Sequence, residues 1–161
     1  MIRPLTLFTL VALFLSSCAG ASRLDNLSPL ERLSDFPHVF ESNDQTYSVG
    51  VRIVGEGNAS TPPFDSPYSL ELGIERRDGD RSLLDRLEIE VDCTMPQHGH
   101  GMNSLPRVEK IAPGRFAAHG FELFMEGEWL LTIDITVRRE GSERGAPFSY
   151  TERAQWWVEP Q

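Results

Sequence analysis

The sequence predicts an all-β chain that folds as an immunoglobulin-like antiparallel β-sandwich of about seven strands. Apolar residues recur at every second position in several short segments, as half-buried strands require. The 161 residues include 13 Gly and 11 Pro, and turn residues separate these segments about every ten positions. Helical periodicity is almost absent, and the length suits one buried domain. A closed barrel is the alternative architecture.

The first two strands are expected at residues 47–53 and 68–74. In both segments the apolar residues share one face, because they fall at alternate positions. Residues 55–67 contain three prolines and separate the two strands. The Asp78-Gly79 pair then marks a turn, since Asp-Gly is a strong turn signal.

The third strand is expected at residues 87–95, where alternation places Cys93 and Met95 on its apolar face. Cys93 is therefore predicted to be a core thiol. The same reasoning gives four further strands, at residues 107–112, 115–125, 129–137 and 148–158. Trp129 begins one of them and is predicted to lie in the core, because a ring of that size buries the area that a small sandwich needs.

Residues 1–17 are predicted to be a lipoprotein signal peptide. Arg3 precedes an uncharged, mostly apolar stretch at residues 5–15, which is too short for a stable membrane anchor. The segment Leu15-Ser16-Ser17-Cys18 that follows resembles the lipobox of bacterial lipoproteins. This resemblance implies cleavage before Cys18, a diacylglycerol on its thiol and a palmitate-type acyl chain on the new amino group. The alternative is an ordinary signal peptide with a chance cysteine.

The same resemblance implies a location in the bacterial cell envelope, anchored by lipid and facing the periplasm. Gly20, two positions after Cys18, resembles the signal for outer-membrane sorting. Residues 18–44 are predicted to be the acylated Cys and a polar tether with a short helix near residues 28–31, and residues 45–161 the sandwich domain. With Cys18 acylated, Cys93 has no partner for an intrachain disulfide.

Composition argues against two classes of function. Lys and Arg number 15 against 24 Asp and Glu, which gives a formal charge of −9, and no segment is rich in basic residues. Nucleic acid is therefore not an expected partner, because it needs a basic surface. The chain also has no serine-nucleophile, phosphate-loop or haem-attachment motif, so an enzyme is not predicted.

One loop carries a set of residues suited to metal binding. Two of the four His and two of the four Met fall within the segment from Met95 to Met102. Thioether and imidazole are ligands that soft copper prefers, so Met95, His98, His100 and Met102 are the candidate copper ligands. His119 and Met125 are further candidates. The alternative is structural, with Met filling gaps at the end of the sandwich and His bonded to backbone.

The loop also resembles a known family. Met95-Pro96-Gln97-His98-Gly99-His100-Gly101-Met102, the turn Gly114-Arg115-Phe116 and the strand start Gly127-Glu128-Trp129 are similar to the YtkA-like domain over about residues 46–137. That family is similar to FixH-like and CopC-like modules. The resemblance implies an immunoglobulin-like sandwich, an association with copper or cytochrome oxidase maturation, and the same four loop residues as ligands. The His that begins mature CopC-type carriers is absent here, because Cys18 would be the first residue.

Two functions follow as hypotheses. In the first, the protein is a lipid-anchored periplasmic module that binds copper at the loop and hands it to a membrane or secreted partner. In the second, it is an interaction module without metal, and Trp156 and Trp157 contact a membrane-protein partner. Because neighbouring residues of a strand point to opposite faces, one of these two Trp side chains must face outward.

Overall fold

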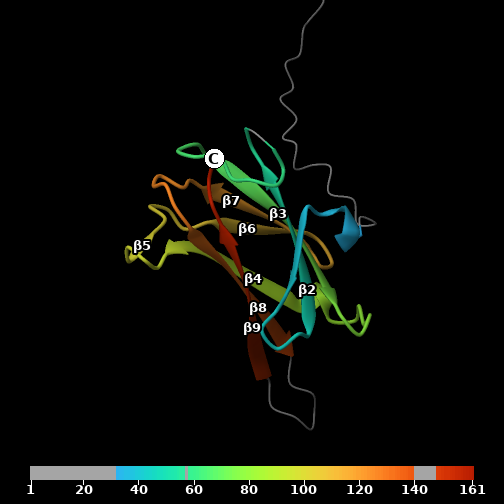
Figure 1. Ribbon diagram of the computed structural model, residues 1–161. Coiled ribbons are helices and arrows are strands. Elements are labelled where there is room, and N and C mark those ends of the chain that lie inside the picture. Colours follow the sequence, from blue (N-terminus) through green and yellow to red (C-terminus); the bar gives the residue numbers. More distant parts are fainter. Residues whose placement is uncertain (1–31, 57, 140–147) are drawn as a thin grey trace, which may run out of the picture.

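The computed structural model describes residues 32–56, 58–139 and 148–161. Within them, two antiparallel sheets pack face to face, which confirms the predicted sandwich (Figure 1). The five-stranded sheet has the order β1-β2-β3-β7-β6 and the four-stranded sheet the order β5-β4-β8-β9. The strands are β1 His38–Glu41, β2 Tyr47–Val54, β3 Tyr68–Arg76, β4 Leu87–Met95, β5 His100–Gly101, β6 Arg107–Ala112, β7 Arg115–Phe121, β8 Trp129–Arg139 and β9 Phe148–Val158.

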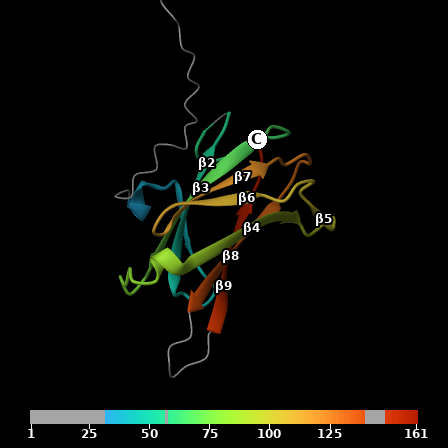
Figure 2. The same ribbon diagram turned by 180° about the vertical axis from the view of Figure 1, so that it is seen from behind.

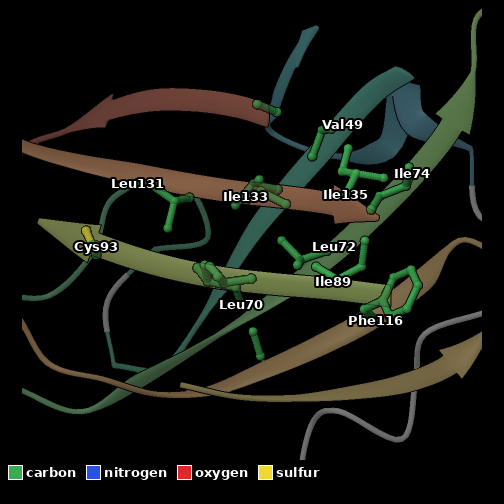
Figure 3. Close-up of a cluster of buried hydrophobic side chains, with 14 of the residues drawn as sticks. Val49, Leu70, Leu72, Ile74, Ile89, Cys93, Phe116, Leu131, Ile133 and Ile135 are labelled. Carbon is green, nitrogen blue, oxygen red and sulfur yellow. The ribbon is translucent and has the colours of Figure 1, made fainter. Parts of the chain in front are cut away.

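The core lies between the two sheets and is built from the alternating residues that the sequence indicates. Figure 3 shows side chains from both sheets meeting there, with Cys93 and Leu131 on neighbouring strands. Cys93 and Trp129 are fully buried, as predicted. Three outward residues of β4, Glu88, Glu90 and Asp92, are exposed and alternate with buried ones. The alternation of apolar and polar residues therefore identifies both the strand and the face that it buries.

The described strands differ from the predicted ones in three places. β1 and β5 were not expected as strands, and β1 extends the sheet into the segment assigned to the tether. The strand predicted at 115–125 ends at Phe121, because Gly120 has a φ of 92° and Leu123 forms an isolated bridge with Phe64 instead. The signal peptide, Cys18 and the helix near residues 28–31 lie outside the described residues.

Helix is confined to single 3₁₀ turns in this part of the chain, at Leu33–Asp35 (η2) and Leu84–Arg86 (η3). Across the described residues there is no helix whose length and apolar character would let it span a membrane.

Candidate metal site

The candidate ligands lie on a tight hairpin that joins β4 to β5. Met95 is the last residue of β4 and pairs with His100 of β5. The His98 N–H donates to the Met95 carbonyl oxygen at 3.1 Å, which closes the turn. Gly99 has a φ of 65°, a conformation that favours glycine. The sequence Pro96-Gln97-His98-Gly99 thus supplies both the rigid start and the glycine that this turn needs.

The pairing register places two of the four candidate ligands on the same side of the hairpin. Met95 and His100 are directly opposite each other, and opposite residues of an antiparallel pair share a face. Met102 follows directly after the end of β5 and has no partner in this register. Met102 is half-buried and packs against the core, whereas His100 is exposed. The thioethers therefore face the protein interior and the imidazole faces solvent.

His98, the fourth candidate ligand, lies in the turn with its ring close to that of His100. The ring centres are 6.4 Å apart and the ring planes differ by 19°. A metal–imidazole nitrogen bond is about 2.0 Å long, so rings on opposite sides of one ion have centres about 6 Å apart. The spacing of these two exposed rings is thus close to that of two imidazoles on one ion, and a turn of the rings that brings a nitrogen of each toward the ion would be needed for binding.

Met95 points across the sandwich to the loop between β7 and β8. Its side chain is 1% exposed, and a Cβ atom added at Gly127 would lie 2.9 Å from its terminal methyl carbon. Figures 1 and 2 both show β5 beside this loop. Met125 lies in the same loop, half-buried against the core, and its carbonyl oxygen accepts a hydrogen bond from Trp129 Nε1 at 3.0 Å. A third thioether therefore belongs to this end of the molecule.

His119, the other further candidate, is not part of this arrangement. It lies on β7 in register with Ser69 and Arg107, on the face turned away from the core. Its Nδ1 forms a 3.2 Å hydrogen bond with the Ser69 hydroxyl. The hairpin and His119 are thus on different faces of the molecule.

The buried thiol beside the hairpin is not an anionic ligand. Burial, and secondarily the charge of Asp92, raises the pKa of Cys93 from 9.0 to about 12. The thiol therefore stays protonated at neutral pH, and the thiolate is the form that binds metals. No group of three or more His, Cys, Asp or Glu in the described residues is placed to hold a metal ion. A metal at the hairpin would consequently depend on its Met residues as well as its His residues.

The two adjacent tryptophans divide between the two faces of β9, as alternation requires. Trp156 is half-buried, and its ring centre lies 4.1 Å from that of His38 and 6.2 Å from that of Phe40. It closes the margin of the core where β1 meets β9. Trp157 is 51% exposed and lies in register with Leu130 on the outer face of the four-stranded sheet. Trp157 is thus the one whose ring is open to a partner.

Sequence reasoning missed the part played by Gly127. In the sequence, Gly127 is recognisable only as part of the strand start before Trp129. Its contact with Met95 depends on how the two sheets pack. The adjacent Met125 and the Trp129 indole were the only signals in the sequence that this loop lies close to the hairpin.

No family model and no curated protein sequence matches this chain. Solved structures with a similar arrangement include FetP of uropathogenic Escherichia coli, at 15% identity and a TM-score of 0.42, over 77% of this chain and 95% of that one. A copper-bound variant of the same FetP has 13% identity and a TM-score of 0.41, over 74% of this chain and 93% of that one. These values are too low to transfer a ligand or a function from FetP to this chain.

Proposed function

We propose that this protein is a non-catalytic, lipid-anchored module of the bacterial cell envelope that binds Cu(I) at the β4–β5 hairpin and hands it to a partner. One observation carries the proposal: the hairpin register places Met95 opposite His100, with the His98 ring 6.4 Å from that of His100, and Met102 follows directly after β5. Neutral thioether and imidazole ligands favour a soft, singly charged ion such as Cu(I).

The exposure of the ligands suits transfer as well as binding. The two imidazoles are exposed, whereas Met95 is buried and Met102 half-buried. The ligands of an acceptor would reach the exposed imidazoles first and replace them one at a time, while the thioethers remain bound to the ion. The formal charge of −9 helps cations approach, an effect that salt screens.

An anaerobic Cu(I) titration against a competing chelator tests this function. The wild-type chain should bind one Cu(I) with a dissociation constant below micromolar, and the His98→Ala/His100→Ala variant should lose at least tenfold in affinity. His119→Ala is the matched control, since it removes an imidazole on another face and should change nothing. Equal affinities in all three proteins would overturn the proposal.

Two sulfur-deleting variants test the role of the thioethers. Met95→Leu and Met102→Leu keep the side-chain volume, so each should cost less than about 1.5 kcal/mol of stability. Each should also weaken Cu(I) binding and leave Cu(II) binding nearly unchanged, because Cu(II) prefers imidazole and oxygen. Unchanged Cu(I) affinity in both variants would leave the two His residues as the only ligands.

The second candidate function is docking of a membrane-protein partner through Trp157 without metal. Its 51% exposure beside Leu130 favours this surface, because exposed Trp is a common contact in interfaces. A photo-crosslinking residue at position 157 tests it in cells. A cross-linked product that persists in the His98→Ala/His100→Ala background would support metal-free docking, and no product at this position would contradict it.

A further inference from the structure

The four-stranded sheet has a free edge along most of β4. One side of β4 pairs with β8 from Leu87 to Thr94. Its other side pairs only with the two residues of β5, at Thr94 and Met95. From Leu87 to Cys93, no strand in the described part of the chain lies on that side. An edge of this kind is a template on which another strand can pair.

Two hydrogen bonds identify the backbone groups that face this edge. The Cys93 N–H donates to Asp92 Oδ1 at 2.8 Å, and the Met95 carbonyl accepts from His98 in the hairpin. Both residues therefore direct their backbone groups away from β8. Because these directions alternate along a strand, the N–H and C=O of Ile89 and Val91 point to the free edge. Within the described residues these groups have no pairing strand.

A groove of about 710 Å³ follows this edge. Beside β4 it is bordered by Leu105, Pro106 and Val108, at the start of β6. Figure 2 shows β6 running next to β4. The groove is also lined by residues of the other two long strands of this sheet, so it extends from the edge of β4 across the outer face of the four-stranded sheet: Leu130, Thr132 and Asp134 of β8, and Arg153 and Gln155 of β9. Its β4 wall runs from Ile89 to Thr94, which at about 3.3 Å per residue is long enough for an extended segment of about six residues.

The side chains around the groove specify the chemistry of an occupant. On the outer face of β4, Glu88, Glu90 and Asp92 follow one another at alternate positions and are exposed. Arg138 neutralises Glu88 at 2.9 Å, and in the groove Arg153 pairs with Asp134 at 2.7 Å. Glu90 and Asp92 have no ion-pair partner among the described residues. The groove therefore carries two uncompensated negative charges, on the face of β4 opposite the buried side chains of Ile89 and Val91.

A second copy of this chain does not fit the edge well. Antiparallel pairing of β4 with another β4 would bring the acidic rows together, and like charges opposite each other destabilise a strand pair. An occupant with Lys or Arg at alternate positions has the complementary pattern, and its intervening apolar residues would face Leu105 and Val108.

We propose that the free edge of β4 is a docking site for an extended segment of a partner protein in which basic and apolar residues alternate, bound by addition as a further strand. The backbone groups of Ile89 and Val91 supply the hydrogen bonds, and Glu90 and Asp92 select the basic side chains. The backbone groups of Ile89 and Val91 and the carboxylates of Glu90 and Asp92 are not among the candidate copper ligands, so the site does not depend on copper.

A synthetic eight-residue peptide that alternates Lys and Val is the probe, with the full chain as its receptor. Binding should slow hydrogen exchange of the Ile89 and Val91 amides at least tenfold, whereas the outward-directed amide of an edge strand exchanges freely without peptide. A peptide that alternates Glu and Val, and one with the four Lys and four Val in two blocks, should bind at least tenfold more weakly.

Charge variants distinguish strand addition from nonspecific electrostatic attraction between the basic peptide and the acidic protein. Glu90→Lys/Asp92→Lys should weaken peptide binding at least tenfold, and Glu122→Lys/Glu159→Lys, with the same charge change at exposed sites elsewhere, should not. Glu90→Gln/Asp92→Asn gives the same test with less disturbance of the strand. The proposal is overturned by no binding of the alternating peptide, by binding without protection at Ile89 and Val91, or by equal binding of the block peptide.

Discussion

Gly127 shows how a single residue shapes the candidate metal site. Its φ is 116°, a backbone conformation that side-chain-bearing residues rarely adopt, and the space where a Cβ would lie is next to the methyl group of Met95. The absence of a side chain there lets the buried thioether reach across the end of the sandwich. The position of the sulfur thus depends on the opposite loop as well as on β4.

Replacement of Gly127 by Ala should destabilise the fold by about 1–3 kcal/mol, because it adds backbone strain and pushes against Met95. Urea denaturation measures the loss. Gly120→Ala is the matched control: Gly120 also has a large positive φ, of 92°, but nothing lies within 4 Å of the added Cβ. The Gly127 variant should lose more stability than the control. Equal losses would show that the contact with Met95 contributes nothing.

The four ligand candidates were visible in the sequence because soft ligands are concentrated in one short segment. What the sequence could not give is their orientation. Alternation predicted that Met95 lies on the core face, but the placement of His100 opposite it depends on the four-residue turn between them. The position of His119 on another face depends on its register with Ser69, which no local pattern contains.

Among the elements, the long strands were predictable and β1 was not. The seven predicted segments correspond to β2–β4 and β6–β9. Most of them alternate long enough to identify a buried face, whereas β6 has no fully buried residue and is identified by the turns that bound it. In β1 burial does not follow apolar character: the apolar Val39 is 50% exposed, whereas its neighbours His38 and Phe40 are half-buried. Its conformation comes from pairing with β2 and from contact with Trp156, which are tertiary effects.

The end of β1 also links the two sheets through a buried hydrogen bond. The Ser42 hydroxyl donates to Glu152 Oε2 at 2.7 Å and accepts from the Tyr47 N–H at 3.0 Å. Ser42 is 2% exposed and Glu152 is 5% exposed. Since a buried carboxylate is costly without a partner, this one hydroxyl helps to hold β9 against the five-stranded sheet.

Ser42→Ala should therefore lower the free energy of unfolding by about 1–3 kcal/mol, because it leaves the Glu152 carboxylate without this donor. Thermal or urea unfolding measures the change. Thr136→Ala is the control: Thr136 forms a hydroxyl pair with Thr151 at 2.7 Å on the exposed face of the same sheet, and its loss should cost about 0.5 kcal/mol or less. A Ser42 variant as stable as the control would contradict a role for this hydroxyl in joining the sheets.

At the scale of the whole molecule, the proposed functions use different surfaces of one scaffold. The hairpin lies at the end of the sandwich beside the β7–β8 loop (Figures 1 and 2), and the groove extends from the edge of β4 across the outer face of the four-stranded sheet. Substitutions of exposed side chains at one place leave the buried core unchanged, so they should leave the other place intact. Copper binding and strand addition can therefore be tested independently.

The attachment of the whole molecule to a membrane is a prediction from its first residues alone. Wild-type protein expressed in a Gram-negative host should incorporate labelled palmitate, and Cys18→Ser should not. Cys93→Ala is the matched control and should keep the label, because Cys93 is fully buried in the core. Label retained by the Cys18 variant would contradict the lipobox interpretation.

The same anchor predicts how the protein responds to salt. A chain with a formal charge of −9 is repelled by anionic lipid headgroups, so acyl chains rather than charge would hold it at the membrane. Wild-type protein should accordingly stay with the membrane fraction at about 1 M salt, where charges are screened within about 3 Å. Replacement of residues 1–18 by a conventional cleaved signal should move it to the soluble periplasmic fraction, with Cu(I) affinity unchanged because the hairpin is retained. Release of the wild type by salt alone would instead indicate a charged protein partner at the membrane.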